Sequence, residues 1–108
     1  MYAITTNRPD YCAQAVEQLY SVLDPEMGVS VIDLGLIEQI DVDVAAQKIY
    51  CRMTLTTAFC PLGEAITNRV QQALQETFPN FSAAVTLDFD SRWTPDRISE
   101  TGKSILDR

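Results

Sequence analysis

The hydrophobic pattern of the chain changes its period at Cys60 and Pro61. Before this point, residues 48–56 alternate between apolar and polar side chains, which is typical of a strand with one buried face. After it, apolar side chains recur at helical spacing, and Pro61 suits a first helical turn because its missing N–H would have no intrahelical partner. The sequence therefore predicts a strand that leads into a helix, with Cys60 at or beside the helix N-cap.

A cysteine in this position can carry chemistry. The positive end of the helix dipole and the unpaired backbone N–H groups of the first turn both favour thiolate over thiol. Cys60 is therefore the first candidate for a reactive or metal-binding sulfur. The alternative is that Cys60 is a small buried apolar residue, as most free cysteines are, and position alone does not choose between the two.

A first helix is predicted to begin near Asn7 and to end at Asp24-Pro25. Asn7 is expected to cap it, Pro9 suits its first turn, and the residue before a proline is disfavoured in a helix. One apolar stripe at helical spacing runs along it, formed by Cys12, Ala15, Val16, Leu19, Tyr20 and Leu23. We therefore assign Cys12 to packing, and we expect residues 1–6 to form a short tail.

The segment 24–35 is predicted to be a packed loop. It is too irregular in pattern for a strand and too apolar for a linker exposed to solvent. Its acidic side chains Asp24, Glu26 and Asp33 are expected to remain available for interactions. The alternative is that they cap backbone N–H groups, which is the commoner fate of aspartates in loops.

Alternating apolar side chains predict three strands, at residues 36–44, 48–56 and 83–89. The first two are expected to form an antiparallel hairpin, with Cys51 on its core face. Near the C-terminus, Trp93 is expected to close an edge of the core, and Ser99 to cap a last helical piece. The order helix, hairpin, helix, strand and short helix predicts an α+β fold: a two-layer sandwich with a small, mostly antiparallel sheet and helices on one face.

Composition narrows the classes of function. A chain of 108 residues is expected to form one domain. The net charge of −7 disfavours a nucleic-acid partner, and no apolar run reaches the roughly 20 residues that span a bilayer. Three widely spaced cysteines indicate reduced thiols in the cytoplasm. Histidine is absent from the sequence, which removes the Cys-His and Ser-His pairs and imidazole metal ligands.

Four groups of residues carry a resemblance to a known family: Asp24-Pro25-Glu26, residues 31–37 (Val-Ile-Asp-Leu-Gly-Leu-Ile), Met53-Thr54-Leu55-Thr56 with Cys60-Pro61, and Trp93-Thr94-Pro95-Asp96. In this order and spacing they resemble the SufT-like and PaaD-type iron–sulfur cluster assembly domain, over nearly the whole chain. The resemblance implies one domain over residues 1–108, an α+β fold of the iron–sulfur cluster assembly superfamily, and a role in maturing iron–sulfur proteins.

The same resemblance assigns candidate site residues. Cys60 matches the characteristic cysteine of the family and is the implied ligand of a metal or cluster. The other motif positions are matched by Asp33, Thr54, Thr56 and Pro61. The outer motifs, which are candidates for a partner surface, contain Asp24, Glu26 and Trp93. PaaD-type members carry an extra cysteine-rich C-terminal segment, and no cysteine follows Cys60, so the resemblance favours the SufT-like branch.

An iron–sulfur cluster usually takes four ligands, most of them cysteine thiolates. One chain offers a single well-placed thiol, Cys60, so we expect iron or a cluster to be held transiently and not to be bound stably by the monomer. The other ligands would come from a second subunit in a homodimer, a partner protein, a small thiol, or Asp33. This predicts an assembly or transfer adaptor, not an enzyme, whose partners are other iron–sulfur assembly proteins and recipient apo-proteins.

Two alternatives remain at this point. The chain could be a thiol enzyme with Cys60 as nucleophile, for which Asp33 or Glu64 would have to serve as the base. It could also be a protein-binding module in which Cys60 only packs and the apolar loop 27–36 meets a partner.

Overall fold

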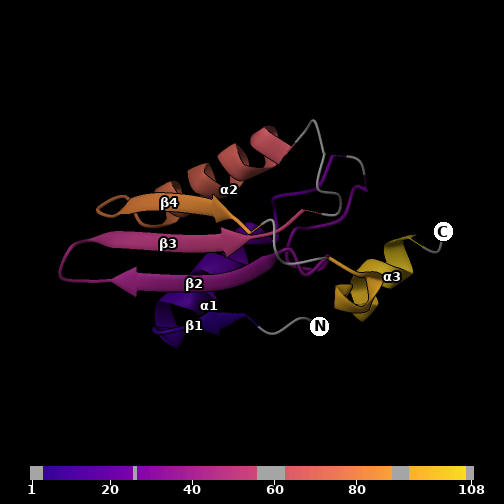
Figure 1. Ribbon diagram of the computed structural model, residues 1–108, viewed down its shortest axis with the longest axis horizontal. Helices are drawn as coiled ribbons and strands as arrows, with labels where there is room; N and C mark the ends of the chain where they lie inside the picture. Colours follow the sequence, from indigo (N-terminus) through magenta and orange to yellow (C-terminus); the bar gives the residue numbers. More distant parts are fainter. Residues whose placement is uncertain (1–3, 26, 56–62, 89–92, 107–108) are drawn as a thin grey trace.

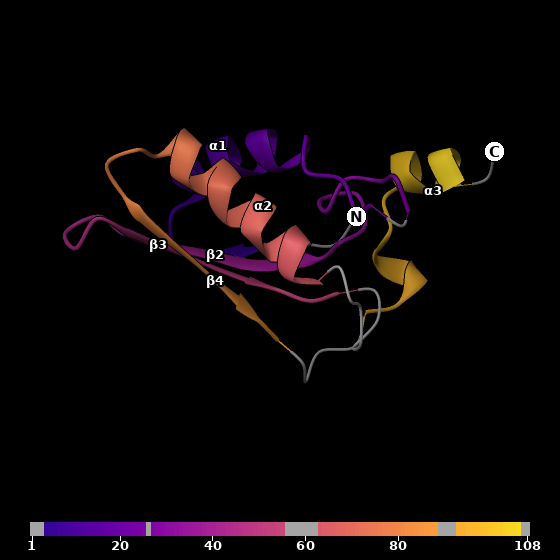
Figure 2. The same cartoon turned by 90° about the horizontal axis from the view of Figure 1, so that it is seen from above.

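The computed structural model describes residues 4–25, 27–55, 63–88 and 93–106 (Figure 1). Four strands form one sheet in the order β1-β2-β3-β4. In chain order the elements are β1 (Thr5–Thr6), α1 (Pro9–Leu19), β2 (Ile37–Asp43), β3 (Lys48–Met53), α2 (Gly63–Thr77), β4 (Ser82–Leu87), the 3-10 helix η1 (Pro95–Arg97) and α3 (Glu100–Leu106). The helices α1 and α2 cover one face of the sheet, and α3 lies beyond the strand ends (Figure 2). The predicted α+β class, with helices on one face of a small sheet, is confirmed.

The strand directions correct the expectation of a mostly antiparallel sheet. Only the central pair, β2 and β3, is antiparallel, whereas β1 pairs with β2 and β3 pairs with β4 in parallel. The reason lies in the connections: α1 joins β1 to β2, and α2 joins β3 to β4. A helical crossover returns the chain to the edge where the first strand began, so the two strands run in the same direction.

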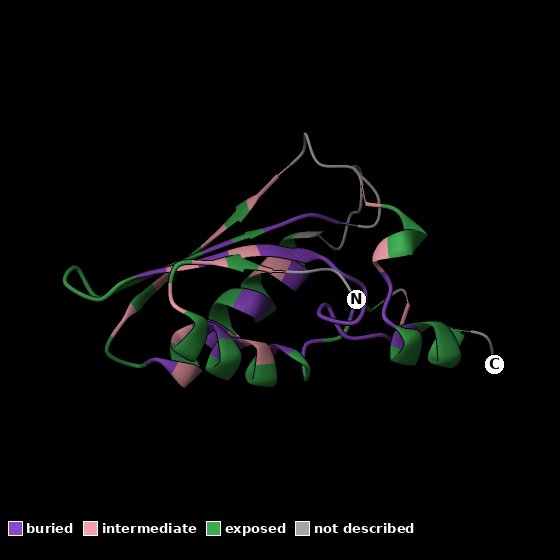
Figure 3. Ribbon diagram, turned by 90° about the horizontal axis from the view of Figure 1, so that it is seen from below, coloured by how far each residue is buried: buried purple, intermediate pink, exposed green. Residues whose placement is uncertain are grey.

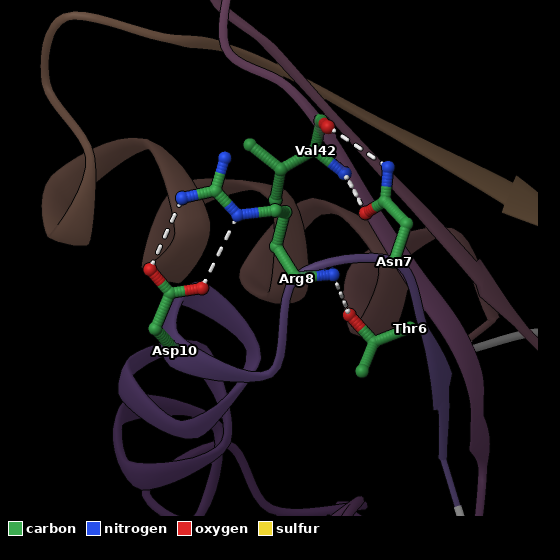
Figure 4. A network of polar contacts seen from close by, with 5 residues as sticks. All are labelled: Thr6, Asn7, Arg8, Asp10 and Val42. Carbon is green, nitrogen blue, oxygen red and sulfur yellow. Dashed lines mark hydrogen bonds and ion pairs between the residues drawn. The ribbon is translucent and has the colours of Figure 1, made fainter.

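The short strand β1 and the start of α1 are held by Asn7 (Figure 4). Its side-chain amide donates to the carbonyl of Val42 at 3.0 Å and accepts the N–H of Val42 at 2.8 Å. Asn7 was expected to cap the helix; the N-cap is instead Arg8, whose side chain makes no capping bond. The Asn7 side chain has this other role because it lies beside β2 and pairs with its backbone.

The helix α1 ends earlier than its apolar stripe predicts. It stops at Leu19, and Tyr20 and Leu23 are exposed. The chain turns there because Leu23 forms an isolated antiparallel bridge with Ser30, supported by the Val31 N–H bond to the carbonyl of Val22 at 2.9 Å. Pairing with the following loop therefore takes the place of the last helical turn.

The core lies between the sheet and the two long helices, and its faces follow the predicted alternation. The buried side chains of the strands and of α2 are Ile37, Ile40, Val42, Ile49, Cys51, Met53, Ile66, Val70 and Leu74. Tyr50 and Arg52 point away from this core and are exposed, as the alternation predicts. Within the described residues, no helix has the length and hydropathy needed to cross a bilayer.

Candidate functional site

Four of the predicted site residues lie outside the described part of the chain: Glu26, Thr56, Cys60 and Pro61. The site is therefore built from the described residues Asp24, Asp33, Thr54 and Trp93 and from what contacts them. All four belong to, or lead into, the end of the molecule where β3 finishes and the chain continues toward Cys60.

The loop that carries Asp33 is a buried part of the fold. Residues 29–38 are buried without interruption, and they form a continuous stretch of buried ribbon in Figure 3. Backbone bonds within the loop join Leu34 N–H to Ser30 and Leu36 N–H to Val31, at 2.9 and 3.0 Å. The turn between them needs a positive φ of 70° at Gly35, a conformation that glycine adopts without a steric penalty. The expected packed loop is confirmed.

Three consecutive carbonyls of this loop, those of residues 33–35, accept hydrogen bonds from residues 93–99 of the C-terminal segment. The donors are Ser99 N–H to Asp33 O at 2.7 Å, Trp93 Nε1 to Leu34 O at 2.6 Å, and Arg97 Nη1 to Gly35 O at 3.5 Å. Buried carbonyls need such partners because water does not reach them. Trp93 thus anchors the C-terminal segment on the loop through its indole N–H, in addition to packing against the core.

The side chain of Asp33 joins the same contact. The hydroxyl of Ser99 donates to Asp33 Oδ1 at 2.7 Å, and Ser99 Oγ accepts the N–H of Gly102 at 3.0 Å. Ser99 is therefore the N-terminal cap of α3, as the sequence predicts. Asp33 is 8% exposed. It was expected to remain available, but its carboxylate is turned into the fold, where it holds the C-terminal helix.

Asp24 also departs from the expectation that it stays available. It is 1% exposed, its Oδ1 accepts the N–H of Met27 at 3.4 Å, and its backbone pairs with Val29. This is the alternative role, in which a loop aspartate satisfies backbone N–H groups. Its burial removes the Asp24 side chain from the surface on which a partner was predicted to bind.

Thr54 lies directly after β3 and ties this strand to the Asp33 loop. It is buried, and its N–H donates to the carbonyl of Leu36 at 2.9 Å. The structure thus brings Asp33, Thr54 and Trp93 together around one loop. The point from which the chain leaves toward Cys60 is consequently fixed by backbone bonds.

A charged network beside this loop was not predicted from the sequence. Glu38 Oε2 lies 3.1 Å from Arg97 Nη1, and Glu38 Oε1 lies 3.7 Å from Arg52 Nε. Arg52 Nε is in turn 3.8 Å from Asp88 Oδ2. The network joins β2, β3, the end of β4 and η1. Glu38 is buried, and leaving a buried charge without its partner costs about 3–5 kcal/mol, so we expect loss of Arg97 to destabilise this end of the sheet.

A bulge in β2 explains why Glu38 can reach these cations. The pairing shifts between Ile37, which lies opposite Met53, and Gln39, which lies opposite Arg52, so Glu38 is an extra residue in its strand. Without the shift, Glu38 would share the core face with Ile40. The adjacent pair Ile37-Glu38 at the start of an alternating run was the sequence signal for this bulge.

Cys12 and Cys51 are both unbonded to other cysteines and buried, which confirms their assignment to packing. Burial raises the pKa of Cys51 to about 12, with a smaller contribution from nearby Cys12. Burial also raises the pKa of Cys12, against a hydrogen bond with Thr6 that lowers it. Both are therefore protonated at neutral pH and do not offer a thiolate to a metal.

These observations limit which metal ion or cluster the described residues can bind. No group of three or more Cys, Asp or Glu side chains among them is arranged around a common metal position. The Asp33 carboxylate is engaged by Ser99, and the two described thiols are in the core. Within the chain as described, the donor set for a four-ligand cluster is incomplete, and Cys60 is the remaining thiol.

Comparison with known proteins gives a consistent result. Residues 13–87 match the family described as iron–sulfur cluster assembly protein. The chain is 34% identical over 88 residues to the Fe-S protein maturation auxiliary factor YitW of Bacillus subtilis, covering 82% of this chain and 85% of that one. It is 33% identical over 87 residues to the Fe-S protein maturation auxiliary factor SufT of Staphylococcus aureus, covering 79% and 96%.

Solved structures resemble the fold over most of its length. The crystal structure of a domain of unknown function from Bacillus anthracis aligns with a TM-score of 0.84 at 26% identity, covering 91% of this chain and 92% of that one. A conserved hypothetical protein from Thermotoga maritima aligns with a TM-score of 0.74 at 30% identity, covering 96% of each.

Proposed function

The chain belongs to the iron–sulfur cluster assembly protein family, and we propose that it is a maturation factor for iron–sulfur proteins that works as an assembly or transfer adaptor with Cys60 at the exchange point. The names of its relatives support the maturation role. The observation that carries the adaptor mechanism is the burial of Cys12 and Cys51 in the core, which leaves one candidate thiol in each chain.

A single thiol suits a factor that passes its cargo on. A resident cluster usually takes four ligands, so a cluster bound through Cys60 would depend on ligands from outside the chain. Such shared ligation is easily exchanged when a recipient with more thiolates arrives. Iron or a cluster is therefore the substrate of this protein, and other assembly proteins and recipient apo-proteins are its partners. Thiols that act in this way remain reduced in a cytoplasmic compartment.

The described residues hold the start of the segment that leads to Cys60 in a fixed position. Thr54 is bonded to the Asp33 loop, and that loop is in turn held by Trp93 and Ser99. The chain between Thr54 and Cys60 therefore starts from a position that is fixed by backbone bonds, near the buried Glu38 carboxylate. In this proposal Asp33 and Trp93 position the site and do not ligate the cargo.

The test is anaerobic reconstitution with ferrous iron and sulfide, read by visible absorption and by iron and sulfide content. Wild type is compared with Cys60→Ser and with Cys12→Ala, a matched control that removes a buried thiol. We expect Cys60→Ser to lose most of the uptake and Cys12→Ala to retain it. Equal uptake by wild type and Cys60→Ser would remove Cys60 from the mechanism.

The alternative of a thiol enzyme is weakened by the position of Asp33. One of its two candidate bases, Asp33, is buried and hydrogen-bonded to Ser99, and the other, Glu64, is exposed in the first turn of α2. Alkylation of Cys60 by iodoacetamide across pH tests this alternative. An apparent pKa near the ordinary value of about 8.5 argues against an activated nucleophile, and a pKa well below it argues for one.

A further inference from the structure

The strand β4 is an edge of the sheet, and one half of that edge is closed by side chains. Gln71 of α2 donates from Nε2 to the carbonyl of Ala83 at 3.1 Å, and Gln75 accepts the N–H of Ala83 at Oε1 at 3.3 Å. Gln75 also donates to the carbonyl of Phe81. The two glutamines therefore bond to the backbone of the edge as a neighbouring strand would, which prevents pairing there.

The other half of the edge has no hydrogen-bonding partner among the described residues. In a parallel ladder the N–H and C=O of one residue point to the same side, and successive residues alternate sides. Because both groups of Ala83 point outward to the glutamines, those of Val85 and Leu87 point outward as well. No described residue donates to or accepts from these four outward groups. Figure 1 shows α2 diverging from β4 toward the C-terminal end of the strand.

We propose that two copies of this chain associate through this half-edge, with the β4 strands antiparallel about a twofold axis. The N–H and C=O of Val85 bond to the C=O and N–H of Leu87 in the second copy, and the reverse pair follows from the symmetry. This register uses all four outward groups of each copy and leaves Gln71 and Gln75 in place. It also places Thr86 of one copy directly opposite Thr86 of the other.

The chemistry of the strand favours a second copy as its partner. A strand that pairs with this half-edge needs two residues, separated by one, whose backbone N–H and C=O groups point toward it. The outer edge of β4 in a second copy has this arrangement. Residues 82–87 contain no charged side chain although the chain carries a net charge of −7. The neighbouring Asp88 carboxylate is paired with Arg52 at 3.8 Å. Two copies can therefore pair here without bringing like charges together across the contact.

The position of the axis brings the C-terminal ends of the two β4 strands close to each other, on opposite sides of the twofold axis. Leu87 lies opposite Met53 in the parallel pair, so β3 and β4 finish together, and β3 leads on toward Cys60. An axis at Thr86 is one residue from that end. The inference that a second copy helps to complete the ligand set of the cargo rests on the function proposed above. The pairing of the two β4 strands does not depend on that function.

Disulfide trapping tests the register. Thr86→Cys is made in a Cys60→Ser background, and Ala84→Cys in the same background is the matched control because Ala84 is exposed on the same face of β4. Residues opposite each other in a non-hydrogen-bonded antiparallel pair have Cα atoms about 4.5 Å apart, which suits a disulfide. The two copies of position 84 would lie roughly 13 Å apart along the strands, beyond the reach of a disulfide.

We expect Thr86→Cys to form a covalent dimer under mild oxidation and Ala84→Cys to remain monomeric. Equal cross-linking of the two variants, or none at position 86, would overturn the proposed register. Neither readout involves iron or Cys60, so a failed dimer and a failed cluster mechanism are distinguished. Circular dichroism of the reduced variants shows whether each has kept the fold.

A second experiment measures association without a cross-link. The interface is small, so we expect a weak dimer, detected by sedimentation equilibrium from about 10 μM to about 1 mM. Val85→Pro removes the outward N–H and leaves the bonds between β3 and β4 intact, while Val85→Ala removes similar packing and keeps the N–H. Val85→Pro should weaken association about tenfold or more, since two hydrogen bonds of the dimer are lost.

Val85→Ala should associate nearly as wild type does. A wild-type chain that stays monomeric throughout this concentration range would overturn the proposal. So would a dimer that Val85→Pro and Val85→Ala affect equally, because the contact would then lie elsewhere.

Discussion

The hydrogen bond between Ser99 and Asp33 provides the sharpest test of how this end of the molecule is held together. Replacing Ser99 with alanine removes the hydroxyl that donates to the Asp33 carboxylate and accepts the N–H of Gly102. A hydrogen bond to a charged group contributes about 1.5–3 kcal/mol, and an N-cap contributes about 1 kcal/mol. We therefore expect Ser99→Ala to cost about 2.5–4 kcal/mol, provided that the C-terminal segment and the rest of the domain unfold together.

A double-mutant cycle separates this bond from its surroundings. Asp33→Ala, Ser99→Ala and the double variant are compared by urea denaturation, and the coupling energy is expected at about 1.5–3 kcal/mol. Asp33→Asn keeps an oxygen acceptor but loses the charge, so its cost should be smaller than that of Asp33→Ala. Amide exchange at Gly102 and Lys103, whose N–H groups bond to Ser99, reports whether α3 opens alone or with the whole domain.

Two results would refute this reasoning. Single-variant costs that add to within about 0.5 kcal/mol would show that Asp33 and Ser99 are not coupled. The second concerns function, measured as maturation of an iron–sulfur enzyme in cells that lack the protein. If Asp33 acts by holding the C-terminal segment, Ser99→Ala and Asp33→Ala lower maturation to a similar degree. Loss with Asp33→Ala alone would show that the carboxylate acts on the cargo directly.

Three further predictions follow from the described contacts. In Gly102→Ala the new Cβ would lie 2.8 Å from Ile98 Cγ2, so we expect a loss of about 1–3 kcal/mol, measured by urea denaturation. Because the Cys51 pKa of about 12 in the fold exceeds the ordinary value of 9.0 for a thiol, its contribution to stability is present below pH 9 and is lost as pH rises from 9 toward 12. The wild type should lose about 1.4 kcal/mol more than Cys51→Ala between pH 8 and pH 10, and equal pH profiles would contradict this. Asn7→Ala removes both bonds to the Val42 backbone and should cost about 1–3 kcal/mol, with faster amide exchange at Val42 as the specific readout.

Local patterns in the sequence were enough to predict most elements and the side chains they bury. Alternation placed Cys51 on the core face of β3, helical spacing placed Cys12 on the buried stripe of α1, and Ser99 was predicted as a cap. These predictions succeed because they depend on neighbours within a few residues in the chain. The family motifs added the role of the protein, and the predictions for Cys60 itself remain to be tested by experiment.

Other features depend on contacts between distant residues, and no local pattern reports them. Alternation shows which face of a strand is buried but not the direction of its neighbour, so the parallel pairs of β1 with β2 and of β3 with β4 came from the helical crossovers. Asp33 and Ser99 are 66 residues apart, and Glu38 and Arg97 are 59 apart. From the sequence alone, the side chain of an aspartate in a motif is expected to be available for interactions. Only the folded chain decides whether its carboxylate meets solvent or a hydroxyl from the other end of the molecule, because the cost of burying it depends on that partner.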